Sequence, residues 1–245
     1  MKIDILGVLF DNLTMEEAVA TGTRLAEEEG FHYVVTPNPE IVNLARASRD
    51  YGELLNGADL VLPDGIGILY AGRILNTPLR ERVPGIDFAA GLLKELAARE
   101  KRLYLLGAKP GVAQEAGVRL AADYPGLMIC GTGDGYFTDS EAAVQAMREA
   151  EADVAFVCLG APKQERWMAE FGPQSGVRLM VGLGGALDVF AGRVARAPRI
   201  WQRLGLEWLY RLLHQPSRIG RMAKLPLFLV TAWRARRGSS ANEKG

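Results

Sequence analysis

The residues best suited to chemistry stand where short apolar runs of the sequence end. Asp64 directly follows one such run and lies between Pro63 and Gly65. A carboxylate in that position can act as a general base and remove a proton from a hydroxyl nucleophile. Alternatively, Asp64 caps a helix over residues 65–75, a position that aspartate fills well. On the residues alone, the cap is slightly favoured.

Polar side chains follow three other apolar runs and suit the recognition of a sugar or a base. Thr36 and Asn38 lie in one proline-stiffened loop and can both donate and accept hydrogen bonds. Gln164 opens a helical segment, and Asp188 either accepts a hydrogen bond from a ligand or caps a helix. Arg82 precedes a V-P-G turn and could reach a diphosphate, although an ordinary surface arginine is the default explanation.

Glycine-rich turns follow several of the same runs. Backbone N–H groups at a strand-to-helix turn can bind phosphate, helped by the helix dipole. The turns include Gly160 and the stretch G-L-G-G-A-L at 182–187, with Gly184 and Gly185. This stretch approaches a dinucleotide fingerprint but ends in Leu187 where Gly or Ala is needed. Tight turns that need positive φ are an equally good explanation.

These residues can meet only if the surrounding elements bring them together. Short apolar runs alternate with segments of helical spacing through about residue 190. The expected strands cover 3–7, 32–36, 60–63, 103–107, 127–130, 154–160 and 179–182. The expected helices cover 15–29, 40–48, 88–100, 112–123, 141–150 and 164–171. The alternation predicts an α/β fold: a Rossmann-like, largely parallel sheet with helices on both faces, whose ligand binds at the carboxyl ends of the strands.

The charge of the chain is zero overall but unevenly distributed. The 245 residues include 29 Lys and Arg and 29 Asp and Glu. Residues 193–245 contain 12 basic and two acidic residues, a net charge of +10, which leaves −10 on residues 1–192. This asymmetry calls for an anionic partner: nucleic acid, a membrane surface or a phosphorylated substrate.

The basic final fifth of the chain is helical and aromatic in character. Arg211, Arg218 and Arg221 would share one face of a continuous helix, although Pro216 makes continuity doubtful. The apolar run at 225–233 is shorter than the roughly 20 residues that span a bilayer. It suits a membrane interface better than a nucleic-acid groove. A solvated helical face is the alternative. We expect a catalytic domain over 1–194, a basic amphipathic membrane and lipid-substrate appendage over 195–237, and a disordered tail over 238–245.

Several classes of function find no support in the sequence. Cys130 and Cys158 cannot build a disulfide framework, which favours a reducing, cytoplasmic setting. The first residues do not have the pattern of a signal peptide. The two histidines and two cysteines lack metal-ligand spacing, and neither an Asp-x-Asp pair nor a nucleophile elbow is present. We therefore expect no metal and no cofactor.

Taken together, these motifs resemble the WecG/TagA/CpsF family of bacterial glycosyltransferases over roughly residues 3–222. Six ordered blocks carry the resemblance: T-P-N-P-E at 36–40, A-D-L-V-L-P-D-G at 58–65, R-V-P-G-I-D-F at 82–88, L-L-G-A-K-P-G-V-A at 105–113, G-A-P-K-Q-E-R-W at 160–167 and G-L-G-G-A-L-D at 182–188. The run R-A-P-R-I-W-Q-R-L-G-L-E-W-L-Y-R-L at 196–212, with P-S-R at 216–218, completes it. The chain departs from the usual family pattern at Ala108, Leu187 and Met222.

The resemblance implies a reaction. Family members look inverting and metal-independent, and they transfer N-acetylmannosamine or a related hexose from a UDP-sugar to undecaprenyl-diphosphate-linked N-acetylglucosamine. The product would feed cell-surface polysaccharide or teichoic acid synthesis. UDP-N-acetylmannosaminuronate and UDP-glucose are alternative donors. A nucleotide-dependent oxidoreductase and a non-catalytic membrane-binding module are the rival classes.

The resemblance also implies roles for residues of this chain. Asp64 is the candidate base, with Thr36 and Arg82 as further catalytic residues. The substrate-binding residues would be Asn38, Gln164, Asp188, Gly160, Gly184 and Gly185. Arg211, Arg218 and Arg221 would contact the lipid diphosphate or the membrane. The implied enzyme is cytoplasmic and peripheral on the inner face of the cell membrane. Its partners would be a UDP-sugar, a polyprenyl-diphosphate-linked acceptor and an anionic membrane surface, with no nucleic acid and an oligomer possible.

Overall fold

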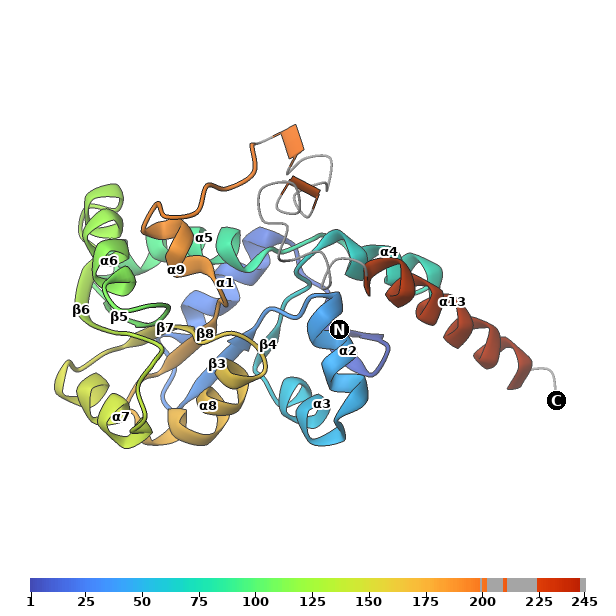
Figure 1. Ribbon diagram of the computed structural model, residues 1–245, viewed down its shortest axis with the longest axis horizontal. Coiled ribbons are helices and arrows are strands. Elements are labelled where there is room, and N and C mark those ends of the chain that lie inside the picture. The colour runs from blue at the N-terminus through green and yellow to red at the C-terminus, as the bar shows by residue number, and fades with distance from the viewer. Residues whose placement is uncertain (199, 202–208, 211–223, 243–245) are drawn as a thin grey trace.

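The centre of the fold is a six-stranded sheet in the order β4-β3-β8-β7-β5-β6 (Figure 1). The computed structural model describes residues 1–198, 200–201, 209–210 and 224–242. The strands of the sheet are β3 (His32–Val35), β4 (Leu60–Val61), β5 (Arg102–Gly107), β6 (Met128–Gly133), β7 (Val154–Cys158) and β8 (Leu179–Gly182). Every neighbouring pair is parallel, so the predicted α/β sheet is confirmed.

Helices cover both faces of this sheet (Figure 1). One face packs against α1 (Met15–Leu25), α5 (Gly85–Ala98), α6 (Val112–Asp123) and α9 (Ala186–Phe190). The other packs against α2 (Pro39–Ala47), α3 (Arg49–Asn56), α7 (Ser140–Glu149) and α8 (Lys163–Phe171), which the 3-10 helix η1 (Gly172–Gln174) follows. In β7, Val154 and Phe156 enter the first core, and Ala155 and Val157 enter the second. Because both faces are buried, such strands are continuous apolar runs in the sequence.

The first predicted strand lies outside this sheet. β1 (Lys2–Ile5) pairs antiparallel with β2 (Val8–Asp11), a strand that the apolar pattern did not predict. Leu6 and Gly7 connect them with φ values of 57° and 92°. Positive φ at both positions matches the twist of a two-residue hairpin, so the chain reverses where we expected one strand to end.

A second unpredicted element, α3, directly follows α2. Ser48 ends α2 and begins α3, where its Oγ accepts a hydrogen bond from the N–H of Tyr51 at 3.4 Å. The side chains of Tyr51 and Leu55 are buried against the second core. The chain thus continues directly from one helix into the next.

The C-terminal helix α13 (Lys224–Asn242) packs against α4 (Ile66–Ile74) and α2, which Figure 1 shows at one end of the molecule. Phe228 and Ala232 of α13 are fully buried. A Cβ added to Gly67 of α4 would lie 2.5 Å from Leu225 Cδ1, so the glycine permits this close packing. The predicted helical C-terminal region is confirmed for this segment, and none of the described helices combines the length and apolar character needed to cross a bilayer.

The boundary of the predicted disordered tail differs from the structure. The tail was expected over 238–245, whereas α13 continues to Asn242. A polar sequence after an apolar helix stretch resembles a tail, but an established helix extends by one hydrogen bond per added residue. Arg211, Arg218 and Arg221 lie outside the described residues.

One glycine at the end of β5 is expected to be essential for stability. Gly107 has a φ of +133°, and a Cβ there would lie 2.4 Å from the carbonyl oxygen of Cys158. Since that neighbour is backbone in a buried strand, Gly107→Ala should lower the free energy of unfolding by about 3 kcal/mol or more. Gly160→Ala is the control, because Gly160 also has positive φ but no atom of the structurally described chain within 4 Å of the added Cβ. Urea denaturation of both variants measures the difference, and equal losses would contradict the steric argument.

Candidate active site

Four loops that carry the predicted residues meet at the carboxyl edge of the sheet. They follow β4, β3, β8 and β7, which are consecutive in the sheet although they lie far apart in the chain. Asp64 follows β4, Thr36 follows β3, Gly184 follows β8 and Gln164 lies in the first turn of the helix after β7. The predicted convergence at one edge is therefore present.

Asp64 lies partly buried in the loop between β4 and α4. The N-cap of α4 is the following glycine, Gly65, so Asp64 does not occupy the N-cap position that the alternative interpretation gave it. The Asp64 N–H donates to the carbonyl of Pro37 at 3.1 Å, which ties it to the loop after β3. The N–H of Val83 donates to the carbonyl of Pro63 at 3.0 Å and brings the chain beside Arg82 to the same loop.

Thr36 joins two strand exits. Its side chain is buried, and its Oγ1 donates to the carbonyl of Gly182 at the end of β8 at 3.1 Å. A Cβ on Gly85 would lie 3.0 Å from this Oγ1, so the glycine lets the start of α5 approach Thr36. Because the hydroxyl proton is used inside the protein, Thr36 can offer a ligand only the lone pairs of its oxygen.

Asn38 caps the helix that follows it. Its Oδ1 accepts hydrogen bonds from the N–H groups of Glu40 at 2.9 Å and Ile41 at 3.1 Å. This arrangement satisfies two N–H groups that the first turn of α2 would otherwise leave without a partner. Any contact of Asn38 with a ligand must therefore come from its amide N–H groups.

Gln164 is buried and connects two of the loops. Its Oε1 accepts from the N–H of Gly160 at 3.3 Å and from the N–H of Gly184 at 2.9 Å. Its Nε2 donates to Oε1 of Glu165 at 2.8 Å. Both ends of the amide are therefore used within the protein, and the residue acts on the site by holding its loops.

The two glycine turns direct their N–H groups inward, toward Gln164. Gly160 and Gly184 have φ values of 77° and 56°, so the interpretation as tight turns with positive φ is correct for both. Because both N–H groups already donate to Gln164, they cannot bind a phosphate in this arrangement. Among the described residues, no atom lies within 4 Å of a Cβ added to Gly160, Gly184 or Gly185, so this part of the chain leaves room for a ligand on that side.

Asp188 lies in α9, after the turn that ends β8. Gly185 is the N-cap of α9 and Asp188 is the third residue of the helix, so the helix-cap interpretation of Asp188 is wrong. The Asp188 carbonyl accepts from the N–H groups of Arg193 at 2.9 Å and Val194 at 3.0 Å. The partly buried carboxylate is positioned by this short helix, near the turn that carries Gly184.

Two residues behind the loops were not predicted from the sequence. Glu165 is fully buried, and Tyr51 donates from its hydroxyl to Glu165 Oε2 at 3.0 Å. Burial raises the pKa of Glu165, and burial followed by the nearby Glu165 charge raises the pKa of Tyr51. A glutamate in the first turn of a helix is ordinarily solvated and interacts with the helix dipole, so the sequence pattern gave no signal of its burial.

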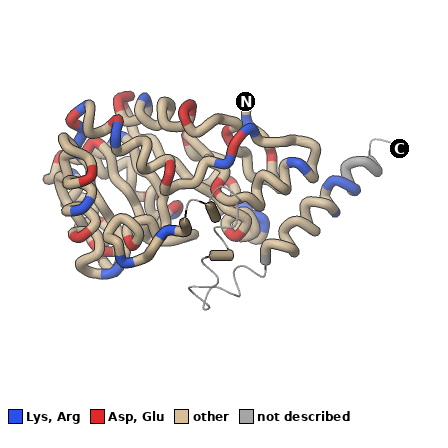
Figure 2. Tube along the Cα trace, turned by 90° about the horizontal axis from the view of Figure 1, so that it is seen from above, with Lys and Arg blue, Asp and Glu red and all other residues tan. Residues whose placement is uncertain are grey.

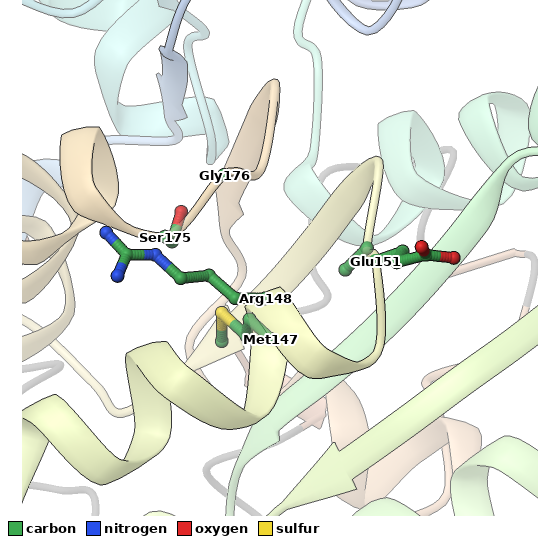
Figure 3. Close-up of a pocket in the computed structure, with 6 residues that line it drawn as sticks. Met147, Arg148, Glu151, Ser175 and Gly176 are labelled. Atoms are coloured by element: carbon green, nitrogen blue, oxygen red, sulfur yellow. The ribbon is translucent and has the colours of Figure 1, made fainter.

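A cavity of about 130 Å³ lies at the opposite, amino edge of the sheet. It is lined by Met147, Arg148, Glu151, Ala152, Ser175 and Gly176, which precede β7 and β8. Figure 3 shows Arg148 extending toward Ser175, whereas Glu151 points away. None of the predicted site residues that the structure describes lines this cavity.

Groups suited to metal binding or to thiol chemistry are scarce in the part of the chain that the structure describes. No cluster of three or more His, Cys, Asp and Glu side chains there could hold a metal ion. Cys130 and Cys158 are free, and burial raises the pKa of the Cys158 thiol to about 12. Cys158 therefore stays a neutral thiol near neutral pH and packs as a small apolar residue.

The fold and the convergence of these polar loops define an α/β protein of the Rossmann-like class with its candidate site at the carboxyl edge of the sheet. The chain belongs to the glycosyl transferase WecG/TagA/CpsF family, whose model matches residues 3–242. It is similar to two proteins named N-acetylglucosaminyldiphosphoundecaprenol N-acetyl-beta-D-mannosaminyltransferase, from Staphylococcus aureus strains MRSA252 and NCTC 8325 / PS 47. Each is 37% identical over 238 residues, which cover 96% of this chain and 94% of the relative. The chain is therefore a glycosyltransferase, and the oxidoreductase and non-catalytic interpretations are wrong.

Proposed function

We propose that this chain transfers N-acetylmannosamine from a UDP-sugar to undecaprenyl-diphosphate-linked N-acetylglucosamine, with inversion at the anomeric carbon. The proposal is supported by similarity along 96% of the chain to the staphylococcal enzymes of that name. The observation that carries it is the position of Asp64, a carboxylate in the loop between β4 and α4 whose backbone is tied to the loop after β3 at the carboxyl edge of the sheet.

The proposed reaction is a single displacement. Asp64 takes the proton of an acceptor hydroxyl while the hydroxyl oxygen bonds to the anomeric carbon of the donor sugar. The bond between that carbon and the diphosphate oxygen breaks, and UDP leaves with both electrons. Arg82 offsets the negative charge that grows on the diphosphate. Attack from the side opposite to the leaving group gives inversion.

The donor is expected to lie along the loops after β3, β7 and β8. Asn38 offers amide N–H groups, Asp188 offers a carboxylate that can accept hydrogen bonds, and Thr36 offers an oxygen. No atom of the described residues lies within 4 Å of a Cβ added to Gly160, Gly184 or Gly185, and this space suits a flat or bulky ligand. Gln164 contributes by holding two of these loops together.

The function is tested by offering the protein a lipid-diphosphate N-acetylglucosamine acceptor and a panel of UDP-sugars. We expect transfer from UDP-N-acetylmannosamine to exceed transfer from UDP-N-acetylmannosaminuronate and UDP-glucose, with mass spectrometry of the product lipid as the readout. A preference for either of the other donors would change the donor assignment and keep the acceptor. No transfer from any of the three would overturn the proposal.

We also propose that the exposed side of α13 binds an anionic membrane surface. Leu227, Val230 and Trp233 are exposed by 63%, 43% and 44%, and their spacing places them opposite the buried Phe228 and Ala232. Arg234 and Arg237 lie on the same side and are exposed. Figure 2 shows the basic residues of α13 gathered toward its outer end. Exposed apolar and aromatic side chains beside arginines are typical of helices that lie in the membrane interface.

The arginine at the outer end of this side is already paired with an aromatic ring. The guanidinium of Arg237 lies 3.8 Å from the centre of the Trp233 ring. Such a pair keeps an apolar surface and a positive charge together at the level of lipid headgroups. The proposed enzyme is accordingly peripheral on the inner face of the membrane that holds its lipid acceptor.

Metal independence is a further expectation for the proposed reaction. Arginine side chains can offset diphosphate charge in the way that a divalent ion does. We therefore expect less than about a twofold change in kcat when EDTA is added, because losing a metal that offsets transition-state charge would cost several kcal/mol. A loss of activity that Mg²⁺ or Mn²⁺ restores would show that a metal takes part.

A further inference from the structure

A chain of buried polar groups runs from α3 to the two glycine turns at the carboxyl edge. Tyr51 donates to one oxygen of Glu165 at 3.0 Å, and the other oxygen accepts from Gln164 Nε2 at 2.8 Å. Gln164 Oε1 then accepts from the N–H groups of Gly160 and Gly184. All three side chains are at most 2% exposed, so water does not compete for these hydrogen bonds.

The partners of Gln164 allow its amide only one orientation. Backbone N–H groups can only donate, and a carboxylate can only accept. If the amide were reversed, its NH₂ would face the N–H groups of Gly160 and Gly184, and its oxygen would face the Glu165 carboxylate. Both contacts would be repulsive, so the Glu165 carboxylate and the two glycines together fix the side chain.

Stability alone does not account for a charge at this position. Burial raises the pKa of Glu165, which reports the cost of taking its charge out of water. Apolar residues of similar volume commonly replace buried charged groups without loss of stability. What an apolar residue cannot do is accept a hydrogen bond from Gln164.

We propose that Glu165 is a positioning residue that fixes the amide orientation of Gln164 and, through it, the two glycine turns of the donor site. Tyr51 supports Glu165 by satisfying its second oxygen. The turns at Gly160 and Gly184 follow neighbouring strands, β7 and β8, and the Gln164 oxygen holds both N–H groups. The link to donor binding rests on the proposed function, whereas the link to the turns rests on the contacts alone.

The experiment compares three variants of the full chain. Tyr51→Phe/Glu165→Met removes the hydroxyl and the carboxylate together, so it leaves no buried charge without a partner. Tyr51→Phe alone is the control, because Glu165 still faces Gln164. Glu165→Gln is the second test variant. The new side-chain amide can both donate and accept hydrogen bonds, so residue 165 no longer favours one orientation of the Gln164 amide.

The readouts are residue-resolved amide hydrogen exchange, the Tm and the Kd for UDP. In Tyr51→Phe/Glu165→Met we expect the amide exchange rates of Gly160 and Gly184 to rise about tenfold, and the Kd for UDP to rise by the same factor. A change of this size corresponds to the loss of one hydrogen bond to a charged group. Exchange at Val157 and Val181 should match that of Tyr51→Phe, and the Tm should be no lower than in that control, which leaves one oxygen of the buried carboxylate unpaired. If Glu165 had a merely structural role, the variant would change amide exchange in the core and in the turns alike.

Several outcomes would overturn the proposal. Unchanged exchange at Gly160 and Gly184 would do so, as would an equal rise at Val157 and Val181. If the double variant does not fold, Glu165→Gln decides: faster exchange confined to the two glycines supports the proposal, and wild-type exchange overturns it. If the turns respond but the wild type does not bind UDP, the positioning role stands and the proposed donor fails. If UDP binds and the turns do not respond, only the positioning role fails.

Discussion

Replacing Asp64 with asparagine is expected to lower kcat for sugar transfer by about 1,000-fold, within the range that a general base contributes. Asparagine keeps the size of the side chain but cannot take the proton of the acceptor hydroxyl. The backbone contacts of this loop, including the bond from the Asp64 N–H to Pro37, do not depend on the carboxylate. The Kd for UDP and the Tm should therefore stay close to those of the wild type. Initial rates with saturating donor and acceptor measure the loss.

Asp123→Asn is the matched control for this variant. Asp123 is exposed at the end of α6, away from the loops of the candidate site, so the same chemical change there should leave kcat unaltered. Retention of more than about a tenth of wild-type kcat in Asp64→Asn would remove Asp64 as the base, because general-base catalysis is worth at least about 100-fold. A large fall in Tm would instead assign the residue a structural role.

Replacing Leu227, Val230 and Trp233 together with serine is expected to weaken binding to anionic vesicles by about 100-fold or more. Each apolar side chain of this kind contributes about 1–2 kcal/mol when it leaves water. Because all three are exposed on α13, the Tm should change little. Transfer to an acceptor in a bilayer should fall with vesicle binding, while transfer to a short-chain, water-soluble acceptor should persist. Co-sedimentation with phosphatidylglycerol vesicles and the two transfer assays measure these effects.

Val118→Ser/Met128→Ser provides the control for this experiment. Both residues are apolar and exposed, but they lie on α6 and β6, at the other end of the sheet from α13. This variant should bind vesicles as the wild type does. Wild-type vesicle binding by the α13 variant would contradict the proposed membrane surface. Equal loss of transfer to both acceptors would indicate damage to the site instead.

The sequence predicted the sheet well because burial on both faces leaves a strong pattern. Runs such as residues 154–158 are apolar at every position, and parallel strands covered by helices require this. The second strand of the N-terminal hairpin, β2, was missed because a strand of four residues is too short for an alternation to stand out. Helix α3 was missed because Ser48 ends one helix and begins the next.

The sequence predicted which residues gather at the candidate site but not which hydrogen bonds they make there. Thr36, Asn38, Asp64 and Gln164 do gather at one edge of the sheet. The structure shows that Asn38 caps α2, that Gln164 holds two turns and that Gly65, not Asp64, is the N-cap of α4. Side-chain types tell which bonds a residue can make, whereas the partners it uses depend on what lies beside it.

By itself, the sequence determined the fold class, the family resemblance and the division of charge between the body and the basic C-terminal fifth. These follow from local properties: apolar periodicity, motif order and the count of charged residues. The tertiary structure alone decided that the loops after β4, β3, β8 and β7 are neighbours, that Glu165 is buried against Tyr51 and that α13 covers α4. The physical reason is that strand order and burial depend on contacts between residues far apart in the chain, which no window of sequence contains.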